Sequence, residues 1–143
     1  SFFFLGVFIS VLGPALPALS RAVGQSEGHL GLSITSRGLG YLAGSAASSV
    51  PPAKVGLSCA NRATMLSLAV LGLGVFSAAI AATRSFAHLV MWTTLQGACG
   101  GAVDTLGNCL ITVVWGDAVA PWMQALHFLF SLGALVSPAV LGA

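Results

Sequence analysis

Long apolar runs, separated by short polar or charged segments, make up most of this 143-residue chain. Each run is close to the roughly 20 residues that a helix needs to cross the bilayer core, and about twice as long as a membrane barrel strand. The pattern therefore predicts an all-α integral membrane protein with about five transmembrane helices. The expected spans lie roughly at residues 1–20, 30–50, 63–83, 88–113 and 123–143.

Composition supports a membrane environment. Only 6% of the residues are charged and 57% are hydrophobic, whereas a soluble domain carries roughly 25% charged residues. A soluble enzyme, a disordered segment and a nucleic-acid binder are therefore excluded, and membrane lipid is the expected surrounding. The three cysteines, Cys59, Cys99 and Cys109, form no paired framework or metal-binding spacing, so neither a catalytic site nor a metal site is predicted.

The few charged residues fall into two groups. Two lie inside predicted spans, Arg37 in the second and Asp104 in the fourth. An ionisable side chain within the bilayer is costly, so these two positions are candidates for a functional role. The others mark the predicted junctions between spans: Arg21, Glu27, Lys54, Arg62, Arg84 and Asp117.

In the second predicted span, polar and small residues recur about every four positions and so share one helix face. They are Ser33, Arg37, Tyr41, Gly44 and Ser48. One interpretation is that Arg37 extends toward the nearer membrane interface. The interpretation favoured by the polar face is that Arg37 points inward, where it pairs with an acid or donates to a substrate hydroxyl.

The fourth and fifth predicted spans each carry a similar face. Asp104 and Asn108 lie one helical turn apart, and Gln124 and His127 begin the face of the fifth span. Asp104 could bind a proton or a cation, or it could form an ion pair with Arg37 that serves assembly alone. The Gln and His could bind substrate hydroxyls or form interhelical hydrogen bonds. Three polar faces predict one shared aqueous cavity, as in transporters.

Small residues one turn apart indicate where helices pack closely. The pairs are Gly40 with Gly44 in the second span and Gly97 with Gly101 in the fourth. Such small-xxx-small pairs let helix backbones approach each other in a membrane. Close crossings of the second and fourth spans are therefore expected at these glycines.

Several motifs resemble the sodium-dependent glucose transporter group of the major facilitator superfamily. The most specific are Asp104-Thr-Leu-Gly-Asn108, Trp115-Gly-Asp117 and Pro121-Trp-Met-Gln124-Ala-Leu-His127-Phe. Val11-Leu-Gly-Pro14 and Arg37-Gly-Leu-Gly-Tyr41 are similar to first-span and second-span motifs of the same group. The group is in turn similar to bacterial fucose–proton symporters.

The resemblance implies a twelve-helix transporter that works by alternating access. Residues 1–143 would form part of the N-terminal six-helix half, and the missing C-terminal half would be its partner. The loops near 51–62 and 115–122 would face the cytoplasm, in a multi-pass protein of the plasma membrane. No cofactor is expected apart from a coupling ion, Na⁺ or H⁺.

The implied function is secondary active transport of a hexose or similar sugar. Asp104 would couple transport to the ion, while Asn108, Gln124, His127 and Arg37 would bind the substrate. One departure is Ala18, which stands where many members of the group carry an acid, so Asp104 remains the sole coupling candidate. The alternatives are a channel-like facilitative pore for a small neutral solute and a transporter-like binding protein that does not transport.

Overall fold

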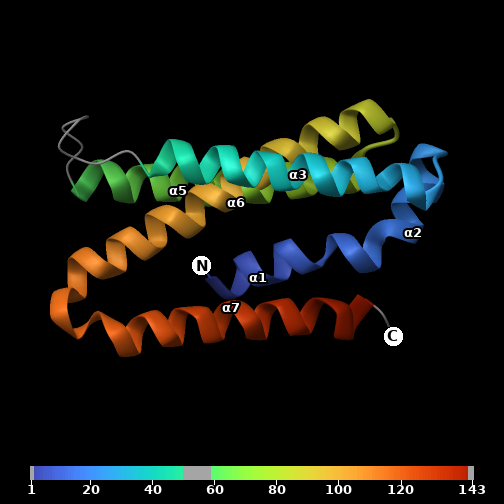
Figure 1. The fold of residues 1–143 in the computed structure, drawn as a ribbon. Coiled ribbons are helices and arrows are strands. Elements are labelled where there is room, and N and C mark those ends of the chain that lie inside the picture. Colours follow the sequence, from blue (N-terminus) through green and yellow to red (C-terminus); the bar gives the residue numbers. More distant parts are fainter. Residues whose placement is uncertain (1, 50–58, 142–143) are drawn as a thin grey trace.

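The computed structural model describes residues 2–49 and 59–141, and the described chain is helical throughout, with no strand. Residues 1, 50–58 and 142–143, which include most of the connection expected near 51–62, lie outside this part of the chain. The helices are α1 (Phe2–Ser10), α2 (Leu12–Val23), α3 (Glu27–Ser48), α5 (Cys59–Ala82), α6 (Phe86–Trp115) and α7 (Val119–Leu141), with a 3-10 turn, η1 (Gly116–Ala118), before α7 (Figure 1).

Successive rods run in alternating directions along one bundle (Figure 1). The bent rod α1–α2 runs one way, α3 returns, and α5, α6 and α7 continue the alternation. The four unbroken helices have 22, 24, 30 and 23 residues. At 1.5 Å per residue they measure roughly 33–45 Å, which exceeds the hydrocarbon thickness of about 30 Å. Each is therefore long enough to cross a bilayer.

Length and hydropathy together select fewer spans than the five runs expected. Asn61–Ala82 and Phe86–Val140 qualify among the described residues, and the bent pair α1–α2 makes a third span if it is counted as one. The 55-residue stretch reverses at η1 and is thus two antiparallel helices (Figure 1). The α3 helix is absent from this set because its first half is rich in Ser, Thr and Gly and contains Arg37.

A bend of 45° separates α1 from α2. Pro14 lies in the first turn of α2 and has no N–H to donate to the carbonyl of Ser10. Its ring also crowds that carbonyl, which is a common cause of a sharp kink. On the α1 side of the bend, the Ser10 hydroxyl donates to the carbonyl of Gly6, at 2.9 Å. The bend therefore has a cause in the local sequence.

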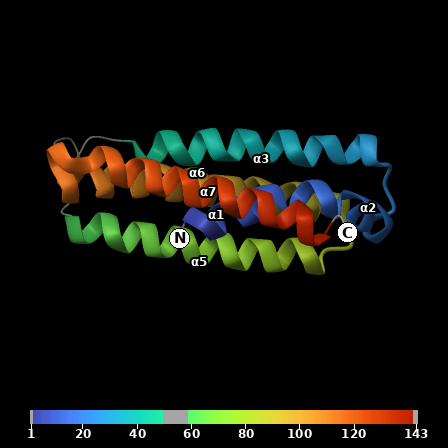
Figure 2. The same cartoon turned by 90° about the horizontal axis from the view of Figure 1, so that it is seen from below.

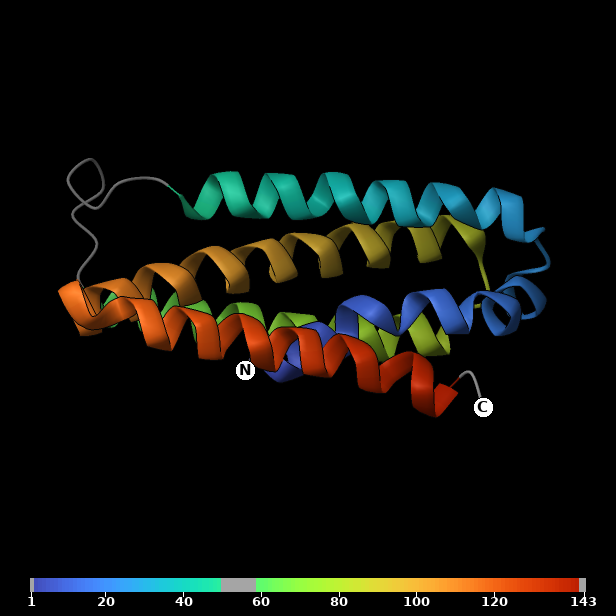
Figure 3. The same ribbon diagram turned by 60° about the horizontal axis from the view of Figure 1, so that its bottom comes forward.

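Glycines bring α3 and α6 into backbone contact, and the two helices run parallel, side by side (Figure 3). A methyl group at Gly40 would overlap the carbonyl of Thr94, and one at Gly97 would overlap the carbonyl of Arg37. Gly44 and Gly101 make equivalent approaches one turn further along both helices. This interface fixes the relative register of α3 and α6, and with it the position of their polar side chains.

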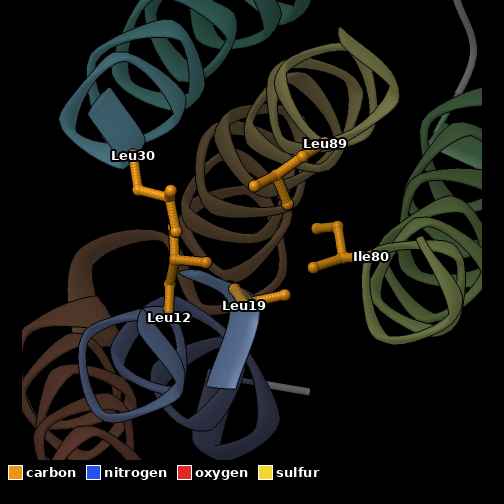
Figure 4. Packing of buried hydrophobic residues seen from close by; sticks show 5 residues of the cluster. All are labelled: Leu12, Leu19, Leu30, Ile80 and Leu89. Carbon is orange, nitrogen blue, oxygen red and sulfur yellow. The ribbon is translucent and has the colours of Figure 1, made fainter. Parts of the chain in front are cut away.

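The remaining helices pack around this pair. The α6 helix lies between α3 and α5, and α1 packs against α7 (Figure 2). Two apolar clusters join the groups. One contains Leu12, Leu19, Leu30, Ile80 and Leu89, contributed by α2, α3, α5 and α6 (Figure 4). The other contains Phe2, Leu5, Leu73 and Val103.

Candidate functional site

Asp104 lies on α6 at the contact with α3 and is half-buried. Both of its carboxylate oxygens accept hydrogen bonds. The Tyr41 hydroxyl donates to Oδ2 at 2.6 Å, and the Asn108 side-chain Nδ2 donates to Oδ1 at 3.0 Å. Tyr41 comes from α3, whereas Asn108 is one turn along α6, so the parallel register of the two helices assembles the group. We call Tyr41, Asp104 and Asn108 the carboxylate cluster.

The ion pair between Arg37 and Asp104, one of the alternatives that the sequence left open, does not form among the described residues. Arg37 donates through Nη2 to the backbone carbonyl of Phe8 in α1, at 3.1 Å, and no described cation pairs with Asp104. The reason is the helix register. Arg37 lies beside Gly97, and Asp104 is seven residues further along α6, a rise of about 10 Å. Tyr41, one turn beyond Arg37, reaches the carboxylate instead.

Asn108 has a second polar side-chain atom, its amide oxygen, which could accept a hydrogen bond. Its Nδ2 is directed to Asp104, and its Oδ1 is buried without a hydrogen-bond partner among the described residues. A buried acceptor without a donor costs roughly 1–3 kcal/mol. The cluster therefore presents one carboxylate and one amide oxygen, which are both suited to a donor or a cation.

A cavity of about 370 Å³ opens beside the cluster, between α1 and α3. Its polar lining is Arg37 and Tyr41, and its other walls are Ile9, Ile34 and Gly38. The volume falls in the range of about 300–1,000 Å³ that small-molecule sites occupy. Arg37 and Tyr41, one turn apart on α3, thus place polar groups against an otherwise apolar space.

Gln124 and His127 do not join this arrangement. Both are exposed on α7, and no hydrogen bond within the described chain links either side chain to the carboxylate cluster. The α7 helix packs on α1, where a methyl at Gly133 would overlap the carbonyl of Phe3. Two of the three polar faces therefore meet, whereas the third faces away from the described helices.

The polar contacts between helices that were not predicted include three that link α6 to its neighbours. Gln96, only 3% exposed, donates from Nε2 to the Ser77 hydroxyl at 2.8 Å, linking α6 to α5. Ser45 and Thr105 share a hydrogen bond of 2.7 Å between α3 and α6. Arg62, expected at a span boundary, is buried in contact with the sulfur of Cys109, which was expected only to pack. Ser45 follows Tyr41 by one helical turn, which was the available signal for its contact, whereas the spacing gave no signal for Gln96 with Ser77.

Together the fold and the cluster define a class of protein: a bundle of membrane-length helices with a carboxylate at a helix interface, beside a solute-sized cavity. Neither a protein-family profile nor a solved structure matches the chain. Curated relatives do. The chain is homologous, over nearly its whole length, to sodium-dependent glucose transporter 1 and to related proteins of the major facilitator superfamily.

Sodium-dependent glucose transporter 1 of Rattus norvegicus is 36% identical over 140 residues, covering 96% of this chain and 28% of that protein. The Homo sapiens protein of the same name is 32% identical over 138 residues, covering 96% and 26%. Major facilitator superfamily domain-containing protein 4A of Homo sapiens is 29% identical over 139 residues, covering 97% and 26%. The chain thus spans about a quarter of the length of these relatives. Homology and candidate spans together identify an integral membrane protein.

Proposed function

We propose that the chain is part of a secondary active transporter that moves a hexose or similar sugar by alternating access, coupled to Na⁺ or H⁺. In this proposal the five alternating rods each cross the membrane, as their directions and lengths allow. The observation that carries it is Asp104, a half-buried carboxylate held by two neutral donors and paired with no cation among the described residues.

The charge of Asp104 explains why an ion is required. A charged side chain near the bilayer centre costs roughly 2.5–3.5 kcal/mol on insertion scales. Hydrogen bonds from Tyr41 and Asn108 offset part of that cost, since charged acceptors form stronger bonds than neutral ones. They leave the net charge in place, however. A cation that binds with the sugar and leaves with it would neutralise the site once in each transport cycle.

The cavity supports a hydroxyl-rich solute. A guanidinium has five N–H donors, and among the described residues Arg37 makes one hydrogen bond, to the Phe8 carbonyl, so further donors remain for a solute. Ile9 and Ile34 offer apolar walls to the C–H face of a sugar ring. Gln124 and His127, exposed on α7, are proposed to contact the sugar from the side that the remaining helices of the complete transporter would enclose.

The close glycine contacts have a proposed role in the same cycle. Gly40, Gly44, Gly97 and Gly101 keep α3 and α6 in backbone contact. The two helices would therefore move as one unit while the bundle rocks, and the carboxylate cluster between them would keep its geometry in both orientations. The complete protein would reside in the plasma membrane.

The test is uptake of radiolabelled glucose by the complete protein in cells, with and without a sodium gradient and with a proton uncoupler. Asp104→Asn is expected to abolish accumulation against a gradient while normal amounts reach the membrane. Asp117→Asn, the same change at an exposed acid in η1, is the matched control and should accumulate glucose normally. Undiminished ion-driven accumulation by Asp104→Asn would contradict the proposal, and glucose entry without any ion dependence would indicate a facilitative pore.

A further inference from the structure

Tyr41 contributes both to the cavity and to the carboxylate cluster. Its side chain lines the cavity of about 370 Å³ between α1 and α3, and its hydroxyl donates to the Asp104 carboxylate at 2.6 Å. Among the described residues, no other side chain both lines this cavity and contacts Asp104. Arg37 lines the cavity but is bonded to Phe8, and Asn108 contacts Asp104 from within α6.

The chemistry of a phenol makes this position informative. A phenol has one O–H donor and lone pairs that accept. An ionised carboxylate can only accept, so the proton of Tyr41 is committed to Asp104 and its oxygen is left as an acceptor. A solute hydroxyl in the cavity could donate to that oxygen. A chain of two hydrogen bonds would then run from the solute through Tyr41 to Asp104, and linked hydrogen bonds polarise each other.

The geometry points to Tyr41 as the link through which a cation at Asp104 changes the affinity of the cavity for a hydroxyl-bearing solute. This inference rests on the proposed transport function. When a cation occupies Asp104, the carboxylate pulls less on the Tyr41 proton, and the phenol becomes able to donate to the solute instead of only accepting from it. The solute hydroxyls that the cavity prefers, and the strength of binding, therefore differ between the free and the occupied site. By linkage, the solute must alter cation affinity by the same factor.

A purely structural role for the Tyr41 hydrogen bond is the competing explanation. Two other hydroxyl pairs join the same helices, Ser45 with Thr105 at 2.7 Å and Ser36 with Thr93 at 3.4 Å. Neither pair includes a charged group or a residue that lines the cavity. Ser45, one turn beyond Tyr41 on α3, therefore provides a matched control, since Ser45→Ala removes an interhelical hydrogen bond without touching either site.

The experiment measures the apparent KM for radiolabelled glucose in vesicles containing the complete protein, with the coupling cation saturating and then absent. Sodium and pH gradients are imposed in separate measurements. The gradient that changes the KM identifies the coupling cation. Coupling energies typical of linked sites predict that the wild type changes its KM about fivefold or more between the two conditions. Tyr41→Phe, which removes only the hydroxyl, is expected to reduce that change to less than about twofold. It should still let glucose move down its gradient, so accumulation falls to the equilibrium level.

Ser45→Ala should keep the full cation-dependent change in KM. The inference is overturned if Tyr41→Phe keeps it too, or if Ser45→Ala loses it to the same extent. A wild type that shows no glucose uptake would overturn the proposed function itself, and this outcome is distinguishable because it does not depend on the variants.

A double variant keeps the test decisive if Tyr41→Phe alone fails to reach the membrane. Combining it with Asp104→Asn removes the carboxylate that would otherwise lose a donor. Without a cation site there is nothing for Tyr41 to transmit, so the cation should change the KM by less than about twofold, both in the double variant and in Asp104→Asn. A cation-dependent change in KM as large as that of the wild type, in either variant, would mean that the cation acts on the cavity by another route, and would overturn the link.

Discussion

Replacing Gly40 by Ala tests whether α3 and α6 are held in the register that builds the carboxylate cluster. The added methyl would overlap the Thr94 carbonyl and crowd Ala98, and both of these are backbone contacts on a packed helix. Neither can move without shifting α6. Overpacking of this kind costs typically about 1–3 kcal/mol. The higher helix propensity of Ala offsets up to about 1 kcal/mol of this cost.

Gly31 separates these two effects because it lies on the same helix and has open space where its methyl would be. Gly31→Ala has the gain in helix propensity without the clash. The difference in unfolding free energy between the two variants therefore isolates the interhelical contact, and we expect Gly40→Ala to be less stable by about 1–3 kcal/mol. The assay is equilibrium unfolding of the complete protein in mixed micelles with increasing denaturing detergent. Equal stability of the two variants would refute the close contact and the register derived from it.

Two further predictions use the same unfolding assay. Arg37→Ala and Asp104→Asn should change the free energy of unfolding additively, within about 0.5 kcal/mol, because the two side chains make no contact. A larger interaction energy would indicate that the two side chains do form an ion pair. Ser77→Ala should destabilise by about 1–3 kcal/mol, more than Gln96→Leu, because it leaves the buried Gln96 amide without any partner. A Gln96→Leu variant that is the less stable of the two would contradict this account of the α5–α6 contact.

Spacing within one helix predicted contacts within that helix. Asp104 and Asn108 are one turn apart and do form a hydrogen bond. Spacing could not predict partners on other helices, because the relative shift of two helices is set by which small residues pack together. Arg37 is the clear case. Its distance from Asp104 follows from the contact of its carbonyl with Gly97, which no pattern within the second span reveals.

The direction of an exposed polar face was likewise beyond the sequence. Gln124 and His127 share one face of α7, as their spacing requires, but the glycine contact at Gly133 turns a different side of that helix toward α1. The bend after α1 had a visible signal in Pro14, whereas the hydrogen bond from Arg37 to the Phe8 carbonyl had none. The helical runs were predictable because charge is excluded from the bilayer core. The connections between polar side chains were not.

The role of Asp104 is tested most directly by measuring radiolabelled sodium and glucose fluxes together in vesicles containing the complete protein. A parallel measurement of proton flux covers the other cation. The wild type should carry one of these cations with glucose at a fixed ratio, and Asp104→Asn should lose that cation flux while Asp117→Asn keeps it. Cation and glucose fluxes that remain linked at the wild-type ratio in Asp104→Asn would contradict the assignment of Asp104 as the coupling carboxylate.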